Sequence, residues 1–186
     1  VITGDALDDN KKPYARRSNM RDTAIIALLG GTGIRVSELV GIDLNDIDWE
    51  HNCIRIIRKG GNEDIVYFGD ELHRYLEDYI NYEREPGDDK EKALFVASRK
   101  DKGRLTVRSV ERIVSKYGTA TIPSKHLSPH SLRRTFGTNY YEETSDLYAV
   151  ADALGHKNIQ VTKDHYADIS ERKKQQVKEF SDKLLK

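Results

Sequence analysis

Two short runs of β-branched and aromatic residues lie on either side of a glycine-rich segment. The runs are Cys53–Arg58 and Ile65–Phe68, and Lys59-Gly60-Gly61-Asn62-Glu63 joins them. Such runs are typical of strands, and a five-residue connection rich in glycine is typical of a hairpin. Leu94–Val96 is a further candidate for a short strand. We therefore expect one small antiparallel sheet.

Most of the remaining chain has helical periodicity, with apolar residues three and four positions apart. Turn and capping residues set the expected limits of each helix. The expected helices are one that Ser18 or Asn19 caps and Gly30-Gly31 ends, one over Ile34–Val40, one over Leu72–Ile80 that Pro86-Gly87 closes, one from Thr106 onward, one that Ser128 caps with Pro129 in its first turn, and one that Ser145 or Asp146 caps and Gly155 ends. The predicted fold class is mainly α with a small antiparallel β-sheet (α+β).

The chain of 186 residues is long enough for one domain with a sizeable core. We expect residues 1–12 to be a linker remnant and residues 13–186 to form the domain, with a charged amphipathic tail helix over 170–186. The longest apolar run, Ala24–Leu29, is too short to span a membrane. The single cysteine, Cys53, excludes an internal disulfide and favours a reducing, cytoplasmic location.

Charge is distributed unevenly, although 31 basic residues balance 31 acidic ones. Residues 63–92 carry eleven acidic residues against four basic ones. Residues 99–134 carry ten basic residues against Asp101 and Glu111: Arg99, Lys100, Lys102, Arg104, Arg108, Arg112, Lys116, Lys125, Arg133 and Arg134. Such asymmetry gives one surface a positive potential whatever the sum, and a basic surface suits a nucleic-acid backbone. Two solvated surfaces of different charge remain the alternative.

Two arginines are candidates for holding a phosphate. Arg35 follows Gly33 at the start of an expected helix, and Arg133 lies in the helix after Pro129. Guanidinium groups match two phosphate oxygens at once and stay charged at any working pH. Glu38, three residues after Arg35, is placed to orient it by a same-face contact.

Four further residues complete a set suited to phosphoryl transfer. His130 lies three residues before Arg133, so it is placed to donate to a phosphate oxygen or move protons near neutrality. His156 follows a helix-ending glycine and suits a second donor. Lys59, at the hairpin tip, suits a general acid for the leaving oxygen. Tyr166, ten residues after His156, offers a phenol that attacks phosphorus if cations offset the cost of phenolate, about 4 kcal/mol at pH 7.

Two common kinds of site are excluded by the pattern of residues. Gly30-Gly31-Thr32-Gly33 lacks the Gly-Lys-Ser/Thr that completes a nucleotide-binding loop. No His-Glu-x-x-His or clustered carboxylate pair suggests a metal site. We therefore expect no metal and no nucleotide cofactor.

Together these residues resemble the tyrosine recombinase (phage-type integrase) family, in its C-terminal catalytic domain. Thr32–Leu39 resembles the first arginine box, and His130-Ser131-Leu132-Arg133 resembles the H-x-x-R box. Leu154-Gly155-His156 resembles the third box, and Tyr166 stands at the nucleophile's place. The resemblance covers the chain from about residue 14. Nothing in the sequence corresponds to the N-terminal core-binding domain that the family usually carries.

The resemblance implies metal-independent cleavage and rejoining of DNA through a 3′-phosphotyrosyl intermediate. It implies the catalytic residues Arg35, Lys59, His130, Arg133, His156 and Tyr166, with Glu38 supporting. The expected partners are double-stranded DNA at a specific crossover site and other protomers, as a tetramer on DNA, with no membrane. Backbone phosphates would be held by basic residues: Arg99, Lys100, Lys102, Arg104, Arg108, Arg112, Lys125 and Arg134. By the same analogy, the C-terminal tail docks on a neighbouring protomer, although packing on its own domain is equally allowed.

Three alternatives remain open at this point. A type IB topoisomerase shares the constellation but relaxes supercoils, and the H-x-x-R box favours the recombinase. A non-catalytic DNA-binding module would need none of the set. A metal-dependent nuclease would lose its activity in EDTA.

Overall fold

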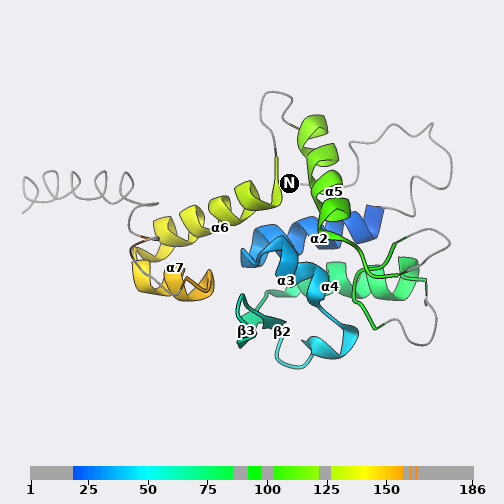
Figure 1. The fold of residues 1–186 in the computed structure, drawn as a ribbon, viewed down its shortest axis with the longest axis horizontal. Helices are drawn as coiled ribbons and strands as arrows, with labels where there is room; N and C mark the ends of the chain where they lie inside the picture. Colours follow the sequence, from blue (N-terminus) through cyan, green and yellow to red (C-terminus); the bar gives the residue numbers. More distant parts are fainter. Residues whose placement is uncertain are drawn as a thin grey trace, which may run out of the picture. The chain divides into compact units, whose positions relative to one another are not determined.

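The computed structural model describes residues 19–85, 92–97, 103–121, 127–156, 160 and 162. The chain divides into two compact units, Val1–Arg134 and Thr135–Lys186, and each is described by itself. The described elements are α2 (Asn19–Thr32), α3 (Val36–Gly41), the 3₁₀ helix η2 (Leu44–Asp46), β1 (Ile47–Asp48), β2 (Cys53–Ile57), β3 (Glu63–Tyr67), α4 (Asp70–Asp78), the π-helix η3 (Tyr79–Glu83), α5 (Val107–Thr121), α6 (Pro129–Thr144) and α7 (Leu147–Ala153). The predicted fold class, mainly α with one small antiparallel sheet, is confirmed (Figure 1).

Helix α2 ends later than predicted. Gly30 and Gly31 lie inside its last turn, so they do not end the helix. The helix ends before Gly33, whose φ of 65° is a left-handed conformation that glycine adopts without strain. The Gly33 N–H donates to the Leu29 carbonyl at 3.1 Å, which closes the final turn. The requirement for a positive φ, rather than low helix propensity, sets this boundary.

Helix α3 begins later than predicted, at Val36 instead of Ile34. Arg35 is its N-cap residue, with an extended backbone at φ −74° and ψ 150°. Ile34 is buried in the core, so its position is fixed by packing and not by helical hydrogen bonds. The sharp change of direction therefore falls on Gly33–Arg35.

The sheet has the order β1-β2-β3, with both pairs antiparallel. The predicted hairpin of β2 and β3 is confirmed, with Ile57 paired to Glu63 at the end next to the turn. Its turn contains Gly60 and Gly61, which have φ of 95° and 82°. Strand β1 was not predicted, because two residues are too short to show alternation.

The predicted strand over Leu94–Val96 is wrong. In the described part of the chain, this segment takes part in one isolated bridge, from Val96 to Arg104, and the preceding Ala93 forms another with Asp43. Leu94, Phe95 and Val96 are all buried, so their apolar character comes from core packing and not from sheet pairing.

Helices α6 and α7 match the predicted capping residues. Ser128 Oγ accepts from the Ser131 N–H at 3.1 Å, with Pro129 in the first turn of α6. Asp146 caps α7, and Gly155 follows that helix with φ of 58°. The helix over Leu72–Ile80 is present but changes to π-helical geometry at Tyr79. Pro86-Gly87 lies outside the described residues.

The main core belongs to the first unit. Helices α2 and α4 lie side by side, and α2 also contacts α3 and α5 (Figure 1). Ile25, Leu28 and Leu29 of α2 are fully buried in this core. In the second unit, Tyr141, Val150 and Leu154 form a smaller cluster. Among the helices of the described part of the chain, none is long and apolar enough to cross a membrane.

Candidate active site

Arg35 is held by Glu38 at the start of α3. The Arg35 N–H donates to Glu38 Oε2 at 2.7 Å, and Arg35 Nη1 donates to Glu38 Oε1 at 2.8 Å. The Glu38 side chain is only 2% exposed, whereas the Arg35 side chain is 33% exposed. The predicted contact between these two residues is confirmed. The carboxylate fixes the guanidinium while part of that group remains accessible to an anion.

Arg133 lies on α6 and reaches the same turn. Its side chain is buried, and its Nη1 donates to the carbonyl oxygen of Gly33, two residues before Arg35. The sequence separation of this bond is 100 residues. His130 precedes Arg133 by one helical turn and is exposed. The structure therefore brings Arg133 to the turn that carries Arg35, with His130 nearby on the same helix.

Lys59 is exposed in the turn of the β2–β3 hairpin. The residue before it, Arg58, is buried and donates from Nη1 to Glu38 Oε2 at 3.2 Å. Glu38 is also the residue that holds Arg35. The hairpin turn with Lys59 is thus tied to the carboxylate that orients Arg35.

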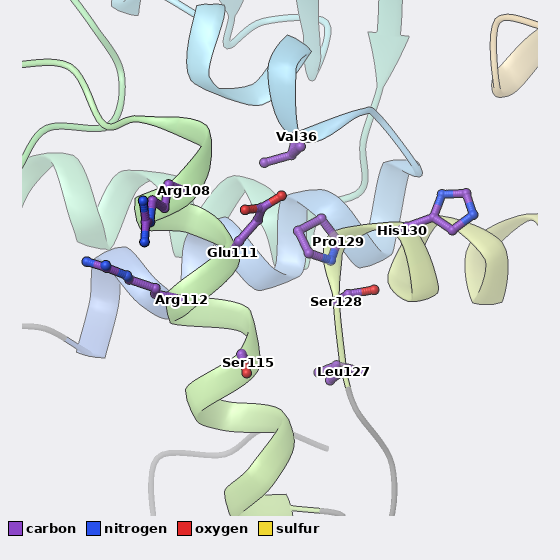
Figure 2. A pocket seen from close by; sticks show the side chains of 9 residues that line it. All are labelled: Val36, Arg108, Glu111, Arg112, Ser115, Leu127, Ser128, Pro129 and His130. Atoms are coloured by element: carbon purple, nitrogen blue, oxygen red, sulfur yellow. The ribbon is translucent and has the colours of Figure 1, made fainter.

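A pocket of about 450 Å³ lies between α5 and the start of α6. Arg108 and Arg112 lie on one side of it and His130 on the other, with Glu111 between them (Figure 2). Gly118 permits the chain to approach α5 here, because a Cβ at that position would lie 2.2 Å from Leu127 Cβ. The pocket thus combines two predicted DNA-binding arginines with one predicted catalytic residue.

Of the other predicted DNA-binding residues, the structure describes Arg104 and Arg134. Arg134 is exposed on α6. Arg104 donates to the carbonyl oxygens of Val40 and Ile42 and pairs with Asp43, so these contacts hold it against the end of α3. The predicted residues Arg99, Lys100, Lys102 and Lys125 lie outside the described residues.

His156 belongs to the second unit. Its N–H donates to the Ala151 carbonyl at 2.8 Å, and its Nδ1 lies 2.9 Å from Thr162 Oγ1. The ring orientation is therefore fixed locally, just after Gly155. Tyr166 lies outside the described residues, as does the predicted tail helix.

The described site is a cluster of cations around one buried carboxylate. Arg35 and Arg58 both donate to Glu38, while Arg133 is bonded to the adjacent turn. Fixed guanidinium groups of this kind stabilise negative charge that develops on phosphate oxygens. Among the described residues, no group of three or more His, Cys, Asp or Glu is arranged to hold a metal ion.

Comparison with known proteins decides the family. The phage integrase family matches residues 6–173, which is most of the chain. The chain belongs to the phage integrase family. This confirms the resemblance that the arginine, histidine and tyrosine boxes indicate.

Several members of the phage integrase family are similar in sequence. The tyrosine recombinase XerC of Corynebacterium glutamicum is 43% identical over 143 residues, which cover 77% of this chain and 45% of that protein. XerC of Vibrio cholerae is 36% identical over 144 residues, which cover 77% of this chain and 46% of that protein. The chain thus spans about half the length of these relatives.

Solved structures of recombinases share the fold. The XerA recombinase matches with a TM-score of 0.72 and 28% identity, over 83% of this chain and 58% of that one. The XerH site-specific recombinase, bound to its palindromic difH substrate after cleavage, also has a TM-score of 0.72. At 23% identity, over 87% of this chain and 46% of that one, the second match supports the fold alone.

Sequence reasoning missed one residue of the site, Arg58. A signal was present, because Ile54, Ile56 and Arg58 lie two positions apart in the predicted strand run Cys53–Arg58. Ile54 and Ile56 are buried, so the same alternation directs Arg58 inward. A charged residue at an inward position requires a partner, and Glu38 is that partner.

Proposed function

We propose that this chain is the catalytic domain of a site-specific DNA recombinase, which cleaves and rejoins strands through a 3′-phosphotyrosyl intermediate. The observation that carries the proposal is the joining of Arg35 and Arg133 at one turn, within a chain of the phage integrase family. The relatives matched are named as recombinases, which favours this activity over type IB relaxation or a non-catalytic binding module.

In the first step, the Tyr166 oxygen attacks the scissile phosphorus and the bond to the 5′-oxygen breaks. Lys59 gives a proton to that leaving oxygen, which becomes a free 5′-hydroxyl. The phenol proton is lost during attack, and we assign His130 as its acceptor because a ring nitrogen of imidazole can bind a proton. The 5′-hydroxyl of a partner strand then reverses the step, so the phosphate ester bond is conserved without a nucleotide cofactor.

The cations act on the pentacoordinate state. Arg35 and Arg133 hold the non-bridging oxygens, and His156 supplies a further donor. Each preorganised donor of this kind contributes about 10²–10³ in rate. Glu38 supports catalysis indirectly, because its two hydrogen bonds fix the orientation of Arg35.

The proposed partners are double-stranded DNA with a specific crossover site and further copies of this protein. The exposed arginines beside the pocket, Arg108 and Arg112, lie on the same α5 surface and suit backbone phosphates. Exchange between two duplexes cleaves four strands, and each cleavage uses one tyrosine. We therefore extend the proposal to a tetramer on DNA.

The test uses nicked duplexes with a randomised centre, in buffer that contains EDTA. Cleavage next to a nick releases a short strand, so the covalent protein–DNA adduct accumulates. Sequencing the adducts identifies the crossover site. The wild-type chain is expected to form the adduct, Tyr166→Phe is expected to form none, and Tyr148→Phe, at an exposed tyrosine of α7, is the matched control.

Two results would overturn the proposal. An adduct that persists in Tyr166→Phe assigns the nucleophile elsewhere. Absence of any wild-type adduct rejects the phosphotyrosyl mechanism. Relaxation of supercoiled plasmid that lacks the selected site would instead support the topoisomerase activity.

A further inference from the structure

Arg58 occupies a position where the strand pattern calls for an apolar residue. Ile54 and Ile56 of β2 are 1% and 2% exposed, and Arg58, the first residue after the strand, continues their two-residue spacing and is also buried. Arg58 is 8% exposed. Burial of a guanidinium is unfavourable unless its donors are bound, so such a residue is expected to have a defined structural or functional role.

Two carboxylates from different elements bind the Arg58 side chain. Its Nη1 donates to Glu38 Oε2 of α3 at 3.2 Å, and its Nε donates to Asp64 Oδ2 of β3 at 2.8 Å. Asp64 pairs with Ile56 across the hairpin, which makes it a diagonal neighbour of Arg58. The guanidinium therefore links both strands of the hairpin to α3.

The turn that follows Arg58 has little stiffness of its own. Gly60 and Gly61 both have positive φ, and glycine restricts the backbone less than any other residue. The Arg58 N–H donates to the Asn62 carbonyl at 2.7 Å, and the Gly61 N–H donates to the Arg58 carbonyl at 3.0 Å. Both backbone bonds of the turn therefore depend on where Arg58 is held.

Glu38 receives hydrogen bonds from both sides of the site. One oxygen accepts from Arg35 Nη1, while the other accepts from the Arg35 N–H and from Arg58 Nη1. A single carboxylate that is 2% exposed thus sets the distance between Arg35 and the start of the Lys59 turn. Displacement of Arg58 would therefore shift Lys59 and leave the Lys59 side chain chemically intact.

We propose that Arg58 is a positioning residue that places Lys59 for proton transfer to the leaving 5′-oxygen, through its contacts with Glu38 and Asp64. This inference rests on the proposed function. Arg58 itself touches neither the DNA nor the reacting atoms in this role.

The test compares two leaving groups on the duplex selected as the crossover site. One substrate has the normal 5′-oxygen at the scissile bond, and the other has a 5′-bridging sulfur. A thiolate is a far better leaving group than an alkoxide, since thiol pKa values lie near about 8.5, and it needs no general acid. Loss of proton transfer therefore slows only the oxygen substrate.

The variants are Arg58→Met, Asp64→Asn, Lys59→Ala and the double variant of Arg58→Met with Lys59→Ala. Arg58→Met keeps side-chain length but removes both ion pairs. Asp64→Asn removes one charge at a side chain that is 42% exposed, so we expect it to leave the fold intact. It therefore provides the test if Arg58→Met does not fold. Arg55→Met is the matched control, because Arg55 lies on the outward face of β2, three residues before Arg58, and its side chain is 50% exposed.

Arg58→Met is expected to slow cleavage of the oxygen substrate by about 10–100-fold, part of what a general acid contributes. The sulfur substrate is expected to restore the rate, as it does for Lys59→Ala. The double variant is expected to be no slower than Lys59→Ala alone, because both changes remove the same step, proton transfer from Lys59 to the leaving oxygen. Asp64→Asn is expected to show a smaller slowing with the same rescue, and Arg55→Met no change.

Equal slowing on both substrates would overturn the proposal, because a merely structural role affects them alike. So would independent, multiplicative losses in the double variant. If the wild-type chain forms no adduct, the proposed function fails, and amide hydrogen exchange then tests Arg58 separately. Faster exchange of the Gly61 amide in Arg58→Met, and not in Arg55→Met, supports positioning of the turn; unchanged exchange overturns it.

Discussion

Two buried carboxylates of the first unit hold arginines in different ways. The side chains of Asp22 in α2 and Glu38 in α3 are each 2% exposed. Asp22 Oδ1 accepts from Arg21 Nη2 at 3.0 Å and from Nε at 3.3 Å. Glu38 accepts from Arg35 and from Arg58. Nearly the same chemistry is therefore present at two places in one unit.

The two sites differ in the exposure and the further contacts of their arginines. The Arg21 side chain is 10% exposed, and its Nη1 donates to the Val96 carbonyl at 3.2 Å. Asp22 Oδ2 also accepts from the Tyr117 hydroxyl of α5 at 3.3 Å. All these contacts of Arg21 and Asp22 join groups within the same unit of the protein. At Glu38, by contrast, the Arg35 side chain remains one-third exposed. A buried carboxylate thus stabilises the fold at Asp22, while at Glu38 it presents a guanidinium to solvent.

The largest expected effect is on stability, for Asp22→Ala. The change removes the carboxylate oxygen that accepts two hydrogen bonds from the buried Arg21 guanidinium, and removal of one partner of a buried pair typically costs about 3–5 kcal/mol. Urea denaturation measures the loss. The cleavage rate per folded molecule is expected to stay near wild type. A rate loss as large as that of an arginine of the site would show that the two carboxylates have the same role.

Arg35→Ala is expected to lower the cleavage rate and to leave the stability nearly unchanged, the reverse of Asp22→Ala. Removal of one preorganised donor lowers the rate of adduct formation by about 10²–10³-fold. Stability is expected to change little, because Glu38 keeps its ion pair with Arg58. Single-turnover cleavage of the nicked duplex measures the rate, and thermal unfolding measures stability. A stability loss comparable to that of Asp22→Ala, with unchanged cleavage, would contradict the contrast.

The hairpin and the caps of α6 and α7 could be predicted from the sequence because each depends on neighbouring residues. The alternation in β2, Ser128 before Pro129, and Asp146 before α7 are all local patterns. The family was recognised in the same way, from short boxes around Arg35 and Arg133. Local chemistry was enough for these features.

Features that depend on tertiary contacts were missed or predicted wrongly. The segment Leu94–Val96 is apolar because it is buried in the core, and not because it pairs in a sheet. Helix α2 continues through Gly30 and Gly31 until Gly33 adopts a positive φ. The contact of Arg58 with Glu38 spans 20 residues, so no local pattern predicts its partner. Such contacts are set by how elements pack.

The smallest expected effect concerns pH, at Glu83 beside the Asp22 network. Burial raises the pKa of Glu83, and the Asp22 charge adds to the rise. The Arg21 N–H, which donates to Glu83 Oε2 at 2.9 Å, and the Arg21 charge both oppose it. A carboxyl with a raised pKa binds its proton more tightly in the folded state than in the unfolded one. Its contribution to stability is therefore lost as the pH rises through the folded pKa.

Glu83→Gln removes the partly buried charge and keeps an acceptor for the Arg21 N–H. The variant is expected to unfold at a temperature higher by a few degrees at most at pH 7. That gain should shrink as the pH falls toward the ordinary glutamate value of about 4.3, where wild-type Glu83 is also protonated. Glu50→Gln, on an exposed turn, is the control and should give no gain. A gain that grows at acid pH would mean that Glu83 stabilises the fold as an anion, which would make this network resemble the one around Glu38.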